Sequence, residues 1–152
     1  PKPYAGGTYT YTIGKKVVEE AAEALGRARL QHYSGAGPDA TQERIAALFA
    51  AVLQGLRDSS PLVVVEHAGR IARERYHAGF GIEEIQVAFN TLEEALWRFL
   101  TQDPVPDELA DDLGAIGSLL GAGKDELARV YVELASHHHA PAVDVEALNT
   151  TM

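Results

Sequence analysis

Apolar residues recur every three or four positions in five stretches of the chain, which are separated by glycine, proline and serine. This spacing places the apolar side chains on one face of an α-helix, so it predicts five amphipathic helices. The predicted helices cover residues 15–33, 39–58, 62–77, 82–100 and 107–136. We therefore expect an all-α, single-domain helical bundle with about five main helices, whose apolar faces pack against one another.

Residues 8–13 depart from this pattern, because threonine, tyrosine and isoleucine alternate there as they do in a β-strand. A single strand does not make a sheet, and the rest of the sequence offers no convincing partner. The segment is either an extended arm on the helices or a strand that pairs with a second subunit. We predict the arm, over residues 1–14, then a helical domain over residues 15–136 and a flexible tail over residues 137–152.

The stretch over residues 62–100 organises the chain, because it reads as two amphipathic helices joined by a tight connector. In that connector, residues 79–81, two glycines flank Phe80, which indicates the end of one helix and the start of the next. In the last predicted helix, Gly121 and Gly123 predict either a break or the close approach of another backbone.

The composition is that of a globular protein, with 46% hydrophobic and 23% charged residues among 152. The chain has 22 acidic and 13 basic residues and a formal net charge of -9. Such a surface repels phosphate backbones and anionic lipids, so we expect no nucleic-acid partner and no membrane docking. No signal pattern and no apolar run of about 20 residues are present, which predicts a cytoplasmic protein. The lack of cysteine excludes disulfides and thiolate sites.

The histidines do not have the spacing of metal ligands. Residues 137–139 are three consecutive histidines, whose side chains point in different directions on a helix and are expected at the surface. A di-iron bundle needs two Glu-x-x-His pairs, and Glu74 with His77 is the only match. We therefore predict no metal site.

His67 and His77 lie ten residues apart and do not share a helix face. Either histidine alone could serve as an axial haem ligand, although a polar histidine at a helix contact is the ordinary interpretation. The Gly-Ala-Gly-Lys sequence at residues 121–124 lacks the first glycine and the Ser/Thr of a phosphate-binding loop. No nucleophile elbow or dinucleotide fingerprint is present, so we predict that the protein is not an enzyme.

Residues 66–75 read Glu-His-Ala-Gly-Arg-Ile-Ala-Arg-Glu-Arg, and residues 79–85 read Gly-Phe-Gly-Ile-Glu-Glu-Ile. These two sequences resemble the N-terminal helical domain of RsbR-type regulators, which are co-antagonists of the RsbT kinase in bacterial stressosomes. The resemblance covers about residues 45–100, with weaker agreement to residue 134. It implies an all-helical, globin-like sensory domain that usually dimerises and usually lacks haem. The remaining residues are too few for an output domain, so we expect a fragment or a stand-alone regulatory domain.

The functional hypothesis is a non-enzymatic bacterial regulatory or sensory domain for signal transduction, without a cofactor. It would act as a homodimer and through a protein partner or a small ligand. Aromatic residues dominate such contacts, and the candidate ligand or interface residues are Tyr76, His77, Phe80, Phe89 and Trp97. The aromatic residues could also be ordinary core residues, an interpretation that we favour for Phe89. The alternative is a haem- or tetrapyrrole-binding globin-like sensor that uses His67 or His77.

Overall fold

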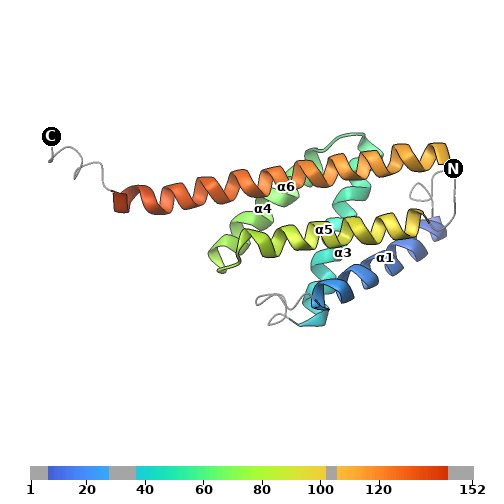
Figure 1. The fold of residues 1–152 in the computed structure, drawn as a ribbon, viewed down its shortest axis with the longest axis horizontal. Helices are drawn as coiled ribbons and strands as arrows, with labels where there is room; N and C mark the ends of the chain where they lie inside the picture. Colours follow the sequence, from blue (N-terminus) through green and yellow to red (C-terminus); the bar gives the residue numbers. More distant parts are fainter. Residues whose placement is uncertain (1–6, 28–36, 102–105, 144–152) are drawn as a thin grey trace.

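A computed structural model of the chain describes the backbone of residues 7–27, 37–101 and 106–143, and the side chains of residues 14–27, 37–101 and 111–137. Five α-helices and no strand make up this part of the chain (Figure 1). They are α1 (Gly7–Arg27), α3 (Pro38–Asp58), α4 (Leu62–His77), α5 (Ile82–Leu100) and α6 (Pro106–Val143). The prediction of a single all-α bundle with about five helices is confirmed. Its globin-like character stays a prediction.

The longest helix, α6, contacts three of the other four, and its most extensive contact is with α4. α5 and α6 lie side by side and run in opposite directions, while α1 packs against α3 and α5 (Figure 1). The C-terminal part of α6 extends past the ends of the other helices (Figure 1). None of the described helices has the length and apolar content that crossing a lipid bilayer requires.

One continuous core joins all five helices. Its largest fully buried side chains come from each of them and include Leu25, Ile45, Val64, Phe89, Leu92, Ile116 and Leu127. Burial of such a side chain stabilises a fold by roughly 1.5–3 kcal/mol. The apolar spacing that predicted the helices therefore also identified the core.

The prediction of an extended arm over residues 1–14 is wrong from Gly7 onward, because α1 begins there. A lone strand would leave its N–H and C=O groups without partners, whereas a longer helix satisfies them internally. Helix formation therefore outweighs the local β-type alternation of residues 8–13. Residues 1–6 of the predicted arm lie outside the described residues, as do residues 28–33 of the first predicted helix.

The last helix is continuous through residues 121–123, so the predicted break does not occur. Gly123 instead allows the close approach of other helices, which was the second of the two predicted alternatives. A Cβ atom at this position would lie 2.7 Å from Phe89 Cε2 and 3.0 Å from Val64 Cγ1. Because Phe89 and Val64 are buried core residues of α5 and α4, the missing side chain lets α6 settle against both helices.

The helix also continues through residues 137–143, which contradicts the prediction of a flexible tail from residue 137. The physical reason is that each added residue of an existing helix gains a backbone hydrogen bond without a new nucleation step. Of the three consecutive histidines, His137 is exposed. The side chains of His138 and His139 and residues 144–152 lie outside the described residues.

The connector between α4 and α5 has the predicted structure. Gly79 adopts a φ of 90°, and Phe80 N–H donates a hydrogen bond to Arg75 O at 2.9 Å. A carboxylate oxygen of Glu84 then accepts from Gly81 N–H at 3.0 Å and caps the start of α5. The second predicted helix begins slightly earlier than expected, at Pro38, and Thr41 lies inside its first turn.

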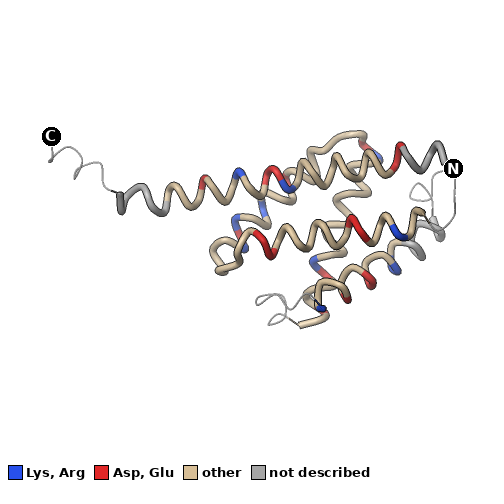
Figure 2. The backbone as a smooth tube through the Cα atoms, viewed as in Figure 1, with Lys and Arg blue, Asp and Glu red and all other residues tan. Residues whose placement is uncertain are grey.

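Acidic and basic residues are interspersed along the described helices (Figure 2). On the outer side of α6, the Arg129 guanidinium pairs with Glu126 and with Glu133, and Arg73 of α4 lies 3.9 Å from Glu133. Exposed pairs of this kind contribute about 0–1 kcal/mol each. Of these pairs, the one between Arg73 and Glu133 joins α4 to α6, and the apolar core provides most of the stability of this contact.

Candidate functional site

Three of the predicted site residues meet at the α4–α5 connector. The Tyr76 ring lies edge-on to the His77 ring, at a centroid distance of 5.6 Å, and to the Tyr131 ring of α6, at 5.3 Å. The Tyr131 hydroxyl donates a hydrogen bond to Phe80 O at 2.8 Å. The guanidinium of Arg44 lies over the Phe80 ring, 5.4 Å from its centroid. The contacts of Tyr131 with Tyr76 and Phe80 hold this aromatic cluster and the connector against α6.

The other two predicted residues lie elsewhere. Phe89 is 1% exposed and belongs to the core beneath Gly123, as the core interpretation predicted. Trp97 is 47% exposed and stands on the outer face of α5. The five candidates are therefore divided among a connector, the core and an open surface.

The surface around Trp97 is formed by polar residues of α5, two of which contact α6. Lys124 of α6 donates a hydrogen bond to Asn90 at 3.0 Å and lies 3.9 Å from Glu93. On its other side, α5 is linked to α1 through the ion pair of Arg98 with Glu20. A shallow hollow of about 510 Å³ surrounds the Trp97 ring. The apolar ring of Trp97 is thus exposed among polar side chains of α5.

His67 is a buried residue of α4, with 8% of its surface exposed. Burial, followed by the positive charges of Arg70 and Arg75, lowers the pKa of His67 from 6.5 to about 4. The Arg70 guanidinium lies 2.9 Å from Nδ1, and because a guanidinium only donates, Nδ1 accepts and the ring proton is on Nε2. An axial haem ligand would need a free lone pair on Nε2. This arrangement does not favour His67 for that role.

His77 is exposed at the end of α4 and packs against Tyr76. Neither His77 nor His67 lines the cavity between α3 and α6, the cavity between α1 and the start of α3, or the hollow at Trp97. Among the described side chains, no group of three or more potential ligands is arranged to hold a metal ion. The haem alternative stays a prediction.

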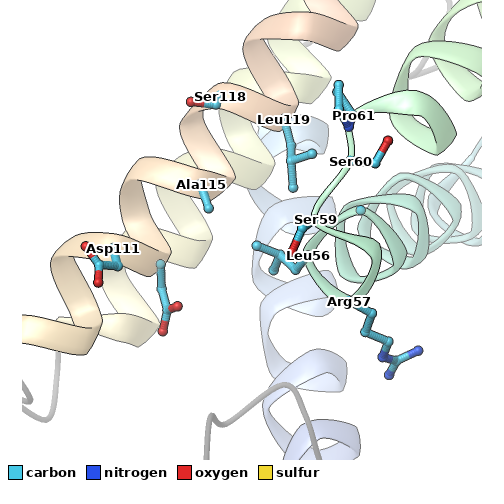
Figure 3. A pocket seen from close by; sticks show the side chains of 11 residues that line it. Leu56, Arg57, Ser59, Ser60, Pro61, Asp111, Ala115, Ser118 and Leu119 are labelled. Atoms are coloured by element: carbon cyan, nitrogen blue, oxygen red, sulfur yellow. The ribbon is translucent and has the colours of Figure 1, made fainter.

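A largely apolar cavity lies between the C-terminal end of α3 and the N-terminal half of α6 (Figure 3). It has a volume of about 530 Å³, within the range of roughly 300–1,000 Å³ typical of small-molecule sites. One wall consists of residues 55–57 and 59–61, and the other consists of α6 residues between Asp111 and Leu119. Leu56, Ala115 and Leu119 face the space between the two walls (Figure 3).

The wall next to α3 is fixed by its turn. Ser59 adopts the left-handed conformation, with φ 51° and ψ 44°, and ends α3. Ser60 N–H then donates to Gly55 O at 3.1 Å, and the Ser60 hydroxyl accepts from Leu62 N–H at 3.2 Å at the start of α4. The cavity wall is therefore held by hydrogen bonds at the end of one helix and at the start of the next.

The polar groups of the cavity are mostly acidic or neutral. Asp111 is exposed at the rim, while Asp112 is only 5% exposed. Arg57 is the one basic residue among the described lining residues, and its side chain points away from Leu56 and Leu119 (Figure 3). The described lining residues include no histidine or lysine that could act as a base for the serines.

The sequence did not reveal this cavity. Its walls come from segments about 55 residues apart, which meet only because α3 and α6 pack together. The one available signal was the combination of a serine-containing turn at residues 58–60 with two small residues, Ala115 and Ser118, on the amphipathic last helix. Neither feature identifies a partner for the other.

The described part of the chain is an all-α domain with a largely apolar cavity between two of its helices. A family model described as the RsbT co-antagonist protein rsbRD N-terminal domain matches residues 12–141. The chain therefore belongs to this family, as the resemblance in residues 66–85 indicated. It is a stress-response signalling co-antagonist domain, and its membership implies RsbT and the stressosome as its partners. No curated protein and no solved structure matches the chain significantly.

Proposed function

We propose that this domain is the input unit of a co-antagonist and that it acts as a homodimer which binds a small ligand or a protein partner. In this proposal, a ligand in the cavity between α3 and α6 changes how α6 packs on the bundle, and α6 carries the change to its C-terminal end. The observation that supports this role is that α6 forms one wall of the cavity and also extends past the bundle. Binding at one end of the helix is thereby connected to the other end without a break in the backbone.

The surface of α5 around Trp97 supports the proposed dimer. A half-exposed tryptophan on a polar rim is typical of protein interfaces, where aromatic residues are enriched. Polar residues of the same helix, Asn90, Glu93, Glu94 and Arg98, line the hollow together with the tryptophan.

Size-exclusion chromatography with light scattering tests the dimer. We expect twice the chain mass of 16.3 kDa at micromolar concentrations. Trp97→Ala should shift the protein toward the monomer, whereas Leu62→Ala, which removes an even more exposed apolar side chain from α4, should not. A wild-type protein that is monomeric throughout this range would refute the proposed dimer.

A spin-label experiment tests the transmission through α6. The chain has no cysteine, so Ser136→Cys, at an exposed position near the end of α6, offers a single attachment site for a nitroxide. We expect the distance between the two labels of a dimer to change when the cavity is saturated with a small molecule found by fragment screening. An unchanged distance with the cavity occupied would contradict transmission through α6.

A further inference from the structure

We infer that the cavity between α3 and α6 binds an uncharged, largely hydrocarbon molecule, which covers the apolar side chains of both walls and forms no ion pair with the protein. This inference rests on the proposed function, since it names the chemical class of the small ligand. Three features of the cavity support it: the apolar surface of its walls, the contact that sets their spacing, and the environment of the polar groups around them.

The two walls present apolar surface to the same space. Leu56 at the end of α3 faces Ala115 and Leu119 of α6 (Figure 3). Pro61, at the start of α4, also lines the cavity. Ala115 and Pro61 are exposed and Leu56 is half-buried, so apolar surface is in contact with water here. A ligand that removes this surface from water gains binding free energy in proportion to the apolar area that it covers.

A close contact between the walls sets their spacing. A Cβ atom at the buried Gly55 would lie 2.9 Å from Leu119 Cδ2 and 3.1 Å from Ser60 O. Because Gly55 has no side chain, Leu119 packs directly against α3 and is only 6% exposed. The two helices therefore touch at this point, and beside it they leave a space of about 530 Å³. Such a space suits a molecule with a single ring or a short alkyl chain.

Three polar groups of the walls already have partners within the chain. Gly55 O accepts a hydrogen bond from Ser60 N–H at 3.1 Å, and Leu56 O accepts from Ser59 N–H at 3.4 Å. Asp112, which is 5% exposed, also has an interaction within the chain. A polar ligand would have to compete with these partners, and a polar group that is buried without a hydrogen bond costs free energy. An apolar ligand leaves the existing interactions in place.

The exposed charges of the lining give little reward to a charged ligand. Asp111 and Arg57 have opposite charges, both are exposed, and the Arg57 side chain points away from Leu56 and Leu119 (Figure 3). Ion pairs with exposed side chains are weak, because water screens them. A charged ligand would also lose part of its own hydration against the apolar walls. The balance therefore favours an uncharged ligand.

Three probes of equal length test this class of ligand. Hexanol, hexylamine and hexanoate share one alkyl chain and differ in the charge of the end group. Binding to the wild-type chain is followed by the amide chemical shifts of residues 55–61 and 111–119. We expect saturable binding of hexanol at these residues, about tenfold tighter than that of either charged probe, because the apolar walls disfavour a charged end group.

A series of alcohols measures the contribution of the apolar walls. From butanol through pentanol to hexanol, each added CH₂ group should tighten binding about two- to fourfold, because each group removes more apolar surface from water. A constant affinity across the series would show that the alkyl chain does not contact the walls, and this result would overturn the inference.

A larger side chain in the space tests the location of the site. Ala115→Leu fills part of the cavity without a change of charge and should weaken hexanol at least about tenfold. Ser136→Leu is the matched control, because it adds the same side chain at an exposed position of α6 outside the cavity, and it should leave the affinity unchanged. If Ala115→Leu does not fold, the three probes and the alcohol series still decide on the wild-type chain.

Each remaining outcome has a defined meaning. Three results would overturn the uncharged ligand: a charged probe that binds as tightly as hexanol, no saturable hexanol shifts at these residues, or an unchanged hexanol affinity in a folded Ala115→Leu protein. In the first case the proposed small-ligand function still holds, with a charged ligand. If hexanol binds as expected but the distance between the α6 labels does not change, the proposed function fails and the apolar site stands.

Discussion

Two glycines that lie two residues apart on α6 should respond oppositely to the same substitution. Gly123→Ala introduces a Cβ atom 2.7 Å from Phe89 Cε2 and 3.0 Å from Val64 Cγ1, which is closer than real Cβ atoms approach at the first of these contacts. Gly121→Ala introduces a Cβ atom with nothing within 4 Å. Both changes gain the same helix propensity, about 1 kcal/mol. The difference between the two variants therefore isolates the cost of the steric conflict.

The magnitude of that conflict follows from the rigidity of its surroundings. Phe89 and Val64 are 1% and 0% exposed, so neither side chain can swing into solvent to make room. Overpacking of a core costs about 1–3 kcal/mol. We therefore expect Gly121→Ala to raise the free energy of unfolding by about 1 kcal/mol. Gly123→Ala should fall about 1–3 kcal/mol below the Gly121→Ala variant.

Urea unfolding followed by far-ultraviolet circular dichroism measures both free energies, with all variants at one protein concentration because the chain is a proposed dimer. The slopes of the unfolding curves should agree among the variants, so that the midpoints report stability alone. Equal stability of the two alanine variants would refute the close approach of α6 to α4 and α5 at Gly123. A Gly121→Ala protein less stable than wild type would show that atoms do lie close to this position, contrary to the free space around it.

Two further predictions concern buried polar groups. The pKa of His67 is about 4 in the folded protein and 6.5 when unperturbed, so the unfolded chain binds more protons between these values. The free energy of unfolding should therefore fall as the pH drops from 6.5 toward 4. Urea unfolding across this range measures the slope, and a His67→Gln variant with an equally steep slope would contradict the prediction. Tyr131→Phe removes the hydrogen bond to Phe80 O and should lower the free energy of unfolding by about 0.5–1.5 kcal/mol, as measured by the same assay; an unaltered stability would show that the hydroxyl does not fasten the connector.

The helices and the core were accessible from the sequence because they depend on periodicity, which every turn of a helix repeats. The connector at residues 79–81 was also predictable, since Gly79 supplies a left-handed conformation that other residues rarely adopt. The segment at residues 8–13 was not, because its alternation is a weak local preference and the helix that continues through it satisfies more backbone groups.

The candidate site was less predictable than the fold, because it depends on contacts between distant segments. Tyr76 and Phe80 were identified as aromatic candidates, but Tyr131, which joins them from α6, carries no signal of its own. The low pKa of His67 depends on burial and on Arg75, eight residues further along α4. The cavity needs the end of α3 beside α6, an arrangement that helical periodicity does not specify.

The continuity of α6 has a geometric consequence. From Leu119 in the cavity wall to Val143, the helix spans about 36 Å, at about 1.5 Å per residue. A tilt of about 5° around Leu119, pivoting as a rigid rod, would displace the far end by about 3 Å, given that length. At Asp111, about 12 Å from Leu119 along the helix, the same tilt moves the backbone by about 1 Å, so a small movement of the cavity wall corresponds to a movement about three times larger at the C-terminal end. If α6 moves in this way, the stiffness of the helix at residues 121–123 determines how much of the displacement reaches its C-terminal end.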